Sequence, residues 1–261
     1  MLIYNQNIWN YNPCHYRNKL VRELIKDFNA DVCTFQECGP STNRVGDAPI
    51  PVLMSDEYTE VCPELAHKNF TPVFYKTEKF TLIDSGYLLY DGINDCDSKG
   101  VTWAVLEDKA TSKRVAIAST HFYWQPGKEE YNQQRLQNAD QLKEVCESIV
   151  AKYGIAVIIG GDFNNGTNAD QGDEPYRKML KDGFIDVRKA AANTTDTLTH
   201  HEYPVLSDNG VYINGSMPTR TLDHIFVYND ASVTLKEFNV ITSQIALNSS
   251  DHCPLIGVFD I

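Results

Sequence analysis

The sequence is poor in basic residues for its size. Its 261 residues include 23 Lys and Arg against 35 Asp and Glu, which gives a formal charge of −12. Proteins that hold long nucleic acids mainly by neutralising phosphates need clustered Lys and Arg. The deficit therefore argues against that class of protein. It does not exclude an enzyme whose phosphate contacts pass through a metal ion.

Long apolar runs and zinc-ligand spacings are also missing. No run approaches the ~20 apolar residues of a membrane helix, and the seven scattered cysteines contain no CxxC pair. We expect most of these cysteines to be small buried residues. Met1 is followed by strand-like residues 2–4 and not by a signal peptide. We therefore expect a reducing, cytoplasmic compartment, although a chain whose leader had been removed would read the same way.

The sequence does have the composition of a folded protein. Hydrophobic residues make up 42% and charged residues 22%, which excludes a disordered or collagen-like chain. We find no internal repeat, linker or break in composition. The simplest prediction is one domain over residues 1–261 that acts as a monomer.

Strands dominate the predicted secondary structure. The apolar run Ile155–Ile159 predicts a strand that is buried on both faces and closed by Gly160 and Gly161. Predicted strands also cover residues 2–9, 31–37, 58–63, 70–76, 79–90, 101–107, 113–121, 222–228, 232–241 and 254–260. Predicted helices cover residues 15–29, 129–152 and 174–182. Long strands covered on one side by helices favour two packed sheets with helices outside.

Polar residues that suit a metal or a phosphate follow several predicted strands. Carboxylates and amides directly after apolar strands are costly to bury unless something pairs with them. Each residue alone is a weak signal, but their recurrence at the ends of separate strands is far less expected by chance. In the segment GGDFN the glycines permit an unusual backbone, and Asp162 and Asn164 project to one side if the chain is extended. The full set is Asn7, Glu37, His121, Asp162, Asn164, Asp223, Asp251 and His252.

Seven short segments resemble one known family, and they occur in that family's order. They are NQNIW, FQE, VTWAVLED, STH, GGDFNN, TLDHIFV and SSDHCPL, between Asn7 and Ile256. The resemblance is to the endonuclease/exonuclease/phosphatase superfamily, a magnesium-dependent group that includes pancreatic-type deoxyribonucleases, neutral sphingomyelinases and inositol polyphosphate phosphatases. It implies a four-layer α/β/β/α sandwich of two packed mixed β-sheets flanked by helices. The active site would lie at one end of the paired sheets.

The resemblance also implies a role for each residue of the set. It implies a metal site with Glu37 as the principal ligand and Asn7 and Asp251 nearby. It implies a phosphate site lined by Asp162 and Asn164. The catalytic pair would be His252 with Asp223 as its orienting carboxylate.

His121 would be a second histidine that faces the phosphate. Some family members orient this histidine with a Glu on the preceding strand, and the rough match here is Asn69. An amide can accept a hydrogen bond but cannot stabilise an imidazolium as a carboxylate does. We therefore expect His121 to act as a neutral donor.

The residue types suit attack of water on a phosphate ester. Mg²⁺, or Mn²⁺ as a substitute, needs hard oxygen ligands such as Glu37 and Asp251, and it neutralises charge on the phosphoryl group. A histidine with an unperturbed pKa of ~6.5 suits removal of a proton from water. Asp223 can fix the tautomer of His252, while Asp162 as the base is the alternative. Asn164 and His121 can donate hydrogen bonds to phosphoryl oxygens.

Other polar and aromatic residues are given ordinary structural roles. We expect His200 and His201 to lie in a solvated loop, His224 to pack in the core, and Arg135 to form a structural ion pair. Trp124 lies in the segment Phe122–Trp124, where aromatic rings can contact the substrate or simply pack the loop.

The loops expected to surround the site are acidic. Residues 10–16, 38–50, 91–99, 122–130, 164–175 and 200–220 contain eleven acidic and four basic residues, including Asp47 and Arg44. Such a rim repels a polyanion, so long duplex nucleic acid is disfavoured. We predict a metal-dependent phosphoesterase that acts on a phosphodiester or phosphomonoester of a small, sugar-phosphate or lipid-headgroup substrate. The alternatives are a nuclease acting on DNA or RNA and a catalytically silent binding module.

Overall fold

The computed structural model describes residues 1–9, 15–39, 49–166, 168–195, 197–208, 212–213 and 216–261. Within these ranges the strands form two large mixed sheets and a two-stranded hairpin, β11 (Val205–Leu206) with β12 (Tyr212–Ile213). The seven-stranded sheet has the order β10 (Asn193–Thr194), β14 (Thr234–Val240), β15 (Leu255–Asp260), β1 (Leu2–Asn7), β2 (Val32–Gln36), β4 (Val73–Lys76) and β3 (Tyr58–Glu60). The six-stranded sheet has the order β5 (Phe80–Leu89), β6 (Gly100–Asp108), β7 (Arg114–His121), β8 (Val157–Asp162), β13 (Asp223–Tyr228) and β9 (Ile185–Asp186).

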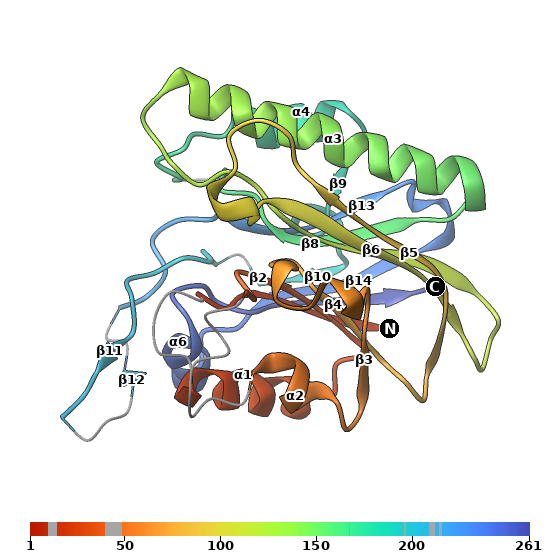
Figure 1. The fold of residues 1–261 in the computed structure, drawn as a ribbon, viewed down its shortest axis with the longest axis horizontal. Helices are drawn as coiled ribbons and strands as arrows, with labels where there is room; N and C mark the ends of the chain where they lie inside the picture. The colour runs from red at the N-terminus through yellow and green to blue at the C-terminus, as the bar shows by residue number, and fades with distance from the viewer. Residues whose placement is uncertain (10–14, 40–48, 167, 196, 209–211, 214–215) are drawn as a thin grey trace.

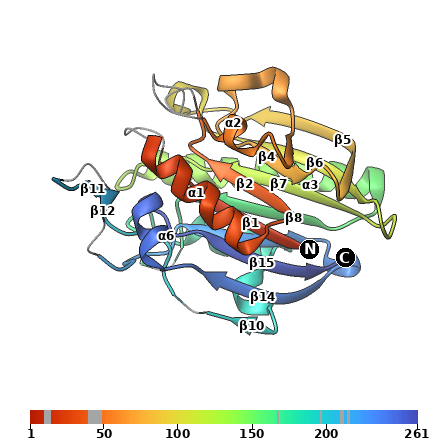
Figure 2. The ribbon, with the colours of Figure 1, turned by 90° about the horizontal axis from the view of Figure 1, so that it is seen from below.

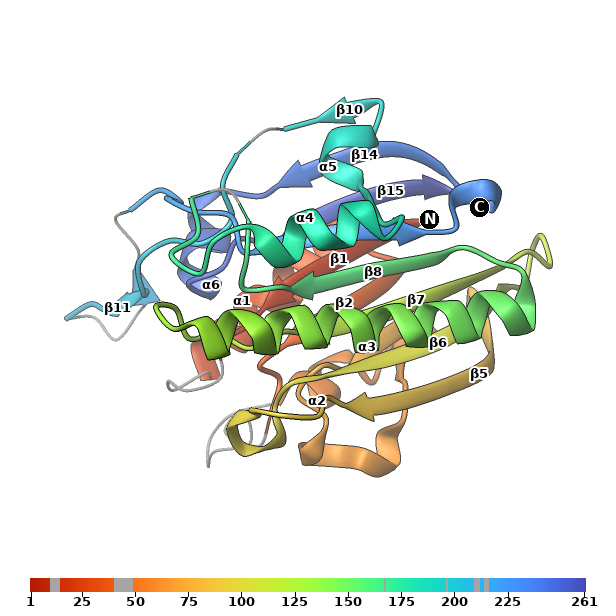
Figure 3. The same ribbon diagram turned by 90° about the horizontal axis from the view of Figure 1, so that it is seen from above.

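Helices cover the outer face of each sheet, so the molecule has the predicted α/β/β/α layers (Figure 1). The outer face of the seven-stranded sheet carries α1 (His15–Phe28), α2 (Ile50–Met54) and α6 (Gln244–Ser249), which Figure 2 shows from below. The six-stranded sheet is covered by α3 (Glu129–Tyr153) and α4 (Glu174–Lys181), seen from above in Figure 3. The short helix α5 (Val187–Ala190) lies beside β13 and β14. Among the described residues every helix is too short or too polar to span a bilayer.

Apolar side chains fill the three interfaces between these layers. Strand β8 shows how the sequence encodes this: Ile158 faces the core between the sheets, whereas Val157 and Ile159 face α3. Burial on both faces explains why the run is continuously apolar. Helix α3 contributes one apolar stripe that includes Leu142 and Cys146. The expectation of buried cysteines holds for five of the six described, since only Cys96 is exposed.

The two glycines of β8 have a different role from the one predicted. The strand does not end at Gly160 but continues through Gly161 to Asp162. A Cβ atom on Gly160 would lie 2.4 Å from Thr34 Oγ1 of the facing sheet, and one on Gly161 would lie 2.6 Å from Thr120 Cγ2. The glycines therefore allow close packing around the strand end and do not form a turn.

Two further boundaries differ from the sequence prediction by three residues. Strand β3 ends at Glu60, because the chain enters a 3₁₀ helix at Pro63–Lys68, where proline has no N–H to donate to a ladder. Strand β4 begins only at Val73. Neither difference affects the strands that carry the predicted site.

The register of the strands brings the predicted site residues to one edge. Strands β1 and β2 run parallel, and so do β7 and β8, where His121 lies opposite Asp162. Strand β13 runs antiparallel to β8, so its first residue, Asp223, also lies opposite Asp162. Polar residues that are distant in the sequence thus meet at the same end of both sheets.

Candidate active site

His252 and Asp223 form a buried pair at the centre of this edge. His252 lies between α6 and β15 and is 5% exposed. Its Nδ1 lies 2.9 Å from Asp223 Oδ2, which also accepts a 2.7 Å hydrogen bond from Thr199 Oγ1. Nδ1–H therefore donates to the carboxylate, and in the neutral form of the ring the lone pair of Nε2 is left toward the cavity. Burial lowers the pKa of His252, but the negative charges of Asp223, Asp251 and Asp162 outweigh it and hold that pKa well above 6.5.

Asp162 already has partners for both of its carboxylate oxygens. Its Oδ1 accepts from the Asn164 N–H at 2.9 Å, and its Oδ2 accepts from Asn7 Nδ2 at 2.9 Å. Burial raises the pKa of Asp162, but the hydrogen bond from His121 and the charge of His252 outweigh it and hold the pKa well below the usual value. Such a carboxylate is a weak proton acceptor, which disfavours Asp162 as the base.

Asn164 does not continue β8 in an extended conformation. Its φ of 48° lies in the left-handed region, and its N–H closes a short turn onto Asp162. The prediction that the two side chains project to one side of an extended strand was therefore wrong. The turn instead directs the Asn164 side chain toward His121, with 3.2 Å between Nδ2 and Nε2.

Glu37 and Asp251 offer oxygens that suit a divalent cation. Glu37 Oε2 is buried and has no hydrogen-bond partner among the described residues. Burial raises the pKa of Asp251 to about 7, and the charge of Glu37 adds to this. A hard cation would offset both carboxylates, so the residues fit Mg²⁺ or a similar ion. Two groups, His200 with Asp251 and His252, and Asp162 with Asp223 and His252, also lie close enough to hold an ion.

Asn7 lies beside these carboxylates but presents its amide nitrogen to them. Nδ2 donates to Glu37 Oε1 at 3.2 Å and to Asp162 Oδ2 at 2.9 Å, while Oδ1 accepts from the Trp9 N–H. In this arrangement Asn7 holds two carboxylates in place. Its role as a metal ligand stays a prediction.

The expected partner of His121 is elsewhere. Asn69 Oδ1 accepts from the Thr71 N–H and from Thr102 Oγ1, so it does not orient the histidine. The group next to His121 Nδ1 is the ammonium of Lys99, at 3.5 Å. Lys99 lies just before β6 and was expected only as one of the four basic residues of the rim; no motif indicated its contact with His121.

His200 belongs to the site, contrary to the expectation of a solvated loop. Its side chain is 14% exposed, and its Nε2 lies 3.8 Å from Asp251 Oδ2. Its ring packs edge-on against that of His252, with 4.6 Å between centroids. Isolated bridges to Arg220 and His252 hold it there, and burial lowers its pKa to about 2. His201 is buried as well, whereas His224 packs in the core as predicted, against Phe163 and Phe226.

Arg135 fixes the loop that carries Trp124 and, contrary to expectation, forms no ion pair with any acidic residue in the described part of the chain. Its guanidinium donates to the carbonyl oxygens of Tyr123, Gln125 and Gln171. The Trp124 indole N–H donates to Asp95, and the indole is 47% exposed. Trp124 therefore stands at the mouth of the site on an anchored backbone.

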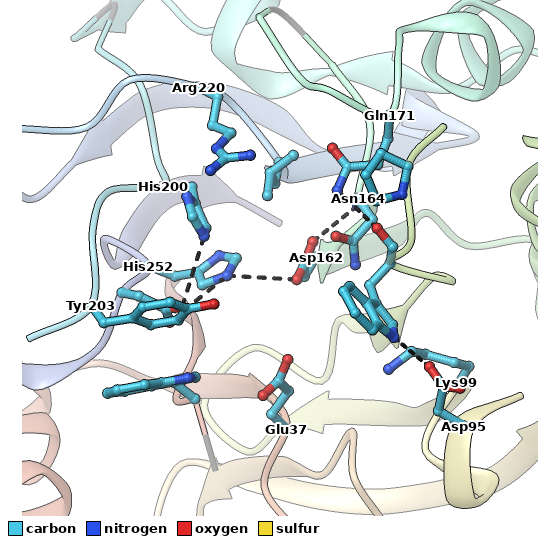
Figure 4. A pocket seen from close by; sticks show the side chains of 15 residues that line it. Glu37, Asp95, Lys99, Asp162, Asn164, Gln171, His200, Tyr203, Arg220 and His252 are labelled. Atoms are coloured by element: carbon cyan, nitrogen blue, oxygen red, sulfur yellow. Dashed lines mark hydrogen bonds and ion pairs between the residues drawn. The ribbon is translucent and has the colours of Figure 1, made fainter. Parts of the chain in front are cut away.

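Part of this set lines one cavity of about 590 Å³ (Figure 4). The lining includes Glu37, Lys99, Asp162, Asn164, His200, Asp251 and His252, whereas Asn7, His121 and Asp223 contact lining residues without forming part of it. Two further lining residues, Trp9 and Tyr203, stack their rings with 4.8 Å between centroids. Arg44 and Asp47 of the predicted rim lie outside the described residues. The described lining contains four acidic and two basic side chains: Glu37, Asp95, Asp162, Asp251, Lys99 and Arg220.

Comparison with known proteins agrees with this fold and geometry. The sequence model described as "Endonuclease/Exonuclease/phosphatase family" matches residues 5–252. The chain belongs to the endonuclease/exonuclease/phosphatase family. Members of this family are hydrolases that act on phosphate esters and usually depend on a divalent metal.

Individual members of the family that resemble the chain differ in what they act on. Human 2',5'-phosphodiesterase 12 is 27% identical over 175 residues, which cover 58% of this chain but only 28% of the human enzyme. The mannosyl-6-phosphatase Bt3783 of Bacteroides thetaiotaomicron has a TM-score of 0.75 at 16% identity, with both chains fully covered. A family protein from Bacteroides vulgatus has a TM-score of 0.75 at 22% identity, covering 100% of this chain and 98% of the other. These structural likenesses support the fold, while the substrate of this chain is a separate question.

Proposed function

We propose that this family member is a Mg²⁺-dependent phosphoesterase that hydrolyses a small phosphate ester by attack of water. The observation that carries the proposal is the convergence of three features in one cavity. These are a histidine whose Nδ1 is bound to a carboxylate, a pair of carboxylates suited to a cation, and the amide of Asn164 as a hydrogen-bond donor.

In the proposed reaction His252 accepts the proton of the attacking water at Nε2. Asp223 keeps the hydrogen of the neutral ring on Nδ1 and supports the cation that forms. Asn164 and His121 lie on the other side of Asp162, where they can donate to phosphoryl oxygens. Glu37 and Asp251 would hold a divalent ion, whose chemistry when bound is to offset the negative charge of the phosphoryl group.

The shape and charge of the cavity favour a small substrate. A volume of about 590 Å³ lies within the usual range for small-molecule sites. The anchored Trp124 loop and the Trp9–Tyr203 stack bound it on two sides. Arg220, one of its basic residues, is already paired with Asp170 at 2.6 Å. A sugar phosphate or a small phosphodiester fits these features better than a long polyanion does.

A nucleotide or short oligonucleotide is the second candidate substrate. Trp124 offers an exposed indole at the mouth, and aromatic rings stack on bases without sequence preference. The human relative that is named a 2',5'-phosphodiesterase is consistent with this possibility. Such a substrate would engage the same phosphate site and place its base against the rim.

Hydrolysis assays separate these candidates. We expect cleavage of p-nitrophenyl phosphate or bis-p-nitrophenyl phosphate with Mg²⁺ or Mn²⁺ and loss of activity with EDTA. A panel of sugar phosphates, nucleotides, short oligonucleotides and sphingomyelin then gives the preferred class, and plasmid nicking tests a nuclease. Plasmid nicking at a higher kcat/KM than any small substrate would overturn the proposed preference, and no metal-dependent cleavage of any ester would overturn the function.

A further inference from the structure

Lys99 is a buried cation in the wall of the cavity. The residue is 3% exposed and lines the same space as Glu37 and Asp162 (Figure 4). Its backbone is fixed by Asn94, whose side chain accepts from the Lys99 N–H at 2.9 Å and donates to the Lys99 carbonyl at 2.8 Å. Burial lowers the pKa of Lys99, whereas the charges of Glu37, Asp162 and Asp95 act to raise it. A position that costs desolvation and is held this firmly calls for a specific role.

The ammonium of Lys99 has one donor more than its protein neighbours use. It donates to Ser98 Oγ at 3.1 Å and lies 3.5 Å from His121 Nδ1. An ammonium has three N–H donors. Among the described residues, no carboxylate lies within ion-pair distance of Lys99. The third donor is therefore available to a group in the cavity.

Lys99 also dictates which nitrogen of His121 carries the hydrogen. An ammonium only donates, so the Nδ1 that faces it must be the acceptor of the neutral ring. The ring hydrogen is then on Nε2, which lies 3.4 Å from Asp162 Oδ2. Asn164 Nδ2 lies 3.2 Å from His121 Nε2, but it has an acceptor of its own in the Phe122 carbonyl at 3.1 Å and does not need Nε2 as a second one. The opposite tautomer would place an N–H against the ammonium.

We propose that Lys99 binds a non-bridging oxygen of the substrate's phosphoryl group and holds His121 as an Nε2–H donor beside it. A carboxylate partner would fix a histidine through an Nδ1–H hydrogen bond and leave Nε2 as the free nitrogen. With Lys99 as the partner, Nδ1 accepts the hydrogen bond, Nε2 carries the hydrogen, and the positive charge lies on the lysine. The site thus formed by Lys99, His121 and Asn164 takes a tetrahedral phosphoryl oxyanion. This inference rests on the proposed phosphoesterase function.

Inorganic phosphate, a product of phosphomonoester hydrolysis, tests the site directly. Phosphate binding to the Mg²⁺-loaded protein is measured by calorimetry for wild type, Lys99→Met, Lys99→Arg and Lys128→Met. Lys128 is an exposed matched control whose ammonium pairs with Glu130. We expect Lys99→Met to weaken phosphate binding at least ~10-fold and to lower kcat/KM by about 10²–10³-fold, the range for loss of one oxyanion donor. Lys99→Arg should recover part of both. Lys128→Met should bind phosphate and turn over substrate like the wild type, and Mg²⁺ affinity should be unchanged in these variants.

A second measurement needs no variant at position 99. Nitrogen-15 chemical shifts of histidine report which ring nitrogen carries the hydrogen, and His121→Gln assigns the signal. We expect His121 to be the Nε2–H tautomer in the wild type. An Nδ1–H tautomer, or equal phosphate binding by wild type and Lys99→Met, would overturn the inference while leaving the phosphoesterase function intact. A wild type that neither binds phosphate nor hydrolyses any ester would overturn both.

Discussion

The floor and the rim of the cavity are built in different ways. The floor consists of side chains at strand ends, such as Asp162 and Asp223, which are almost completely buried and fixed by the register of both sheets. The rim consists of loop residues such as Trp124, which is 47% exposed, and Tyr203, which is 60% exposed. The floor carries groups that can move a proton or hold a cation, whereas the rim offers aromatic surface. This division implies that floor substitutions change kcat and that rim substitutions change KM.

The largest expected effect comes from removing the proposed base from the floor. His252→Ala should lower kcat by about 10²–10⁴-fold, the usual cost of losing a general base. Mg²⁺ affinity should persist, because Glu37 and Asp251 remain. Single-turnover kinetics at saturating Mg²⁺ and calorimetric Mg²⁺ binding check both statements.

The matched comparison for that variant is Asp223→Asn. It keeps the size of the side chain but removes the charge that lies 2.9 Å from Nδ1. It should lose less activity than His252→Ala and should also leave Mg²⁺ affinity unchanged. If His252→Ala kept most of its rate, the base would be another residue, and Asp162 would be tested first despite its low pKa.

Glu37→Gln tests the other half of the floor and should have the next largest effect. The substitution keeps an oxygen near Asn7 but removes one of two charges available to a cation. We expect Mg²⁺ affinity to fall at least ~10-fold and activity to fall with it, with partial recovery at high Mg²⁺. Thermal unfolding of the metal-free protein should be nearly unchanged. Wild-type Mg²⁺ dependence in this variant would show that Glu37 is not a ligand.

The floor could be predicted from the sequence because its signals are local. Floor residues such as Glu37, Asp162 and Asp223 lie at or next to the ends of apolar strands, and the pairing of these strands brings them to one edge. The sandwich itself follows from the same pattern of strands and helices. The glycines of β8 were misread, because the sequence gives no measure of how closely the facing sheet approaches Gly160.

The loops of the rim were predicted from the sequence, but the contacts of their side chains could not be, because those contacts join distant segments. His200 enters the site through backbone pairing with Arg220 and His252, and no pattern of residues around His200 predicts this pairing. Lys99 reaches His121 from a loop before β6. Arg135 was expected to pair with an acid, but it instead binds backbone carbonyls that have no sequence signature.

A substitution in the rim tests the difference between floor and rim, because we expect it to change KM and not kcat, and by a smaller factor. Trp124→Ala removes the exposed indole but leaves Arg135 to anchor the loop backbone. We expect KM to rise about 5–10-fold and kcat to change less than twofold on the preferred substrate, because stacking on one half-exposed ring should lie at the lower end of the usual range of about 1–3 kcal/mol. Steady-state kinetics measure both. A large fall in kcat with unchanged KM would place Trp124 with the floor.

The smallest effect on catalysis is expected just beneath the floor, at His224. It follows Asp223 on β13 but points to the opposite face, where Nε2 contacts the Asn165 carbonyl at 2.9 Å. Burial lowers its pKa from 6.5 to about 4, so the unfolded chain binds a proton more readily than the folded protein does. The contribution of His224 to the free energy of unfolding is therefore fully present above pH 6.5 and is lost as the pH drops toward 4. At about 1.4 kcal/mol per pH unit, the loss is on the order of 3 kcal/mol when fully developed.

His224→Gln keeps a donor for Asn165 but cannot titrate. Urea unfolding of both proteins at pH 7 and pH 4.5 should show a smaller acid-induced loss in the variant, with His200 and His201 contributing equally to both. Equal losses would mean that His224 is not among the groups that limit stability in acid, whereas a large change in kcat at pH 7 would mean that the core beneath Asp223 also sets the geometry of the floor.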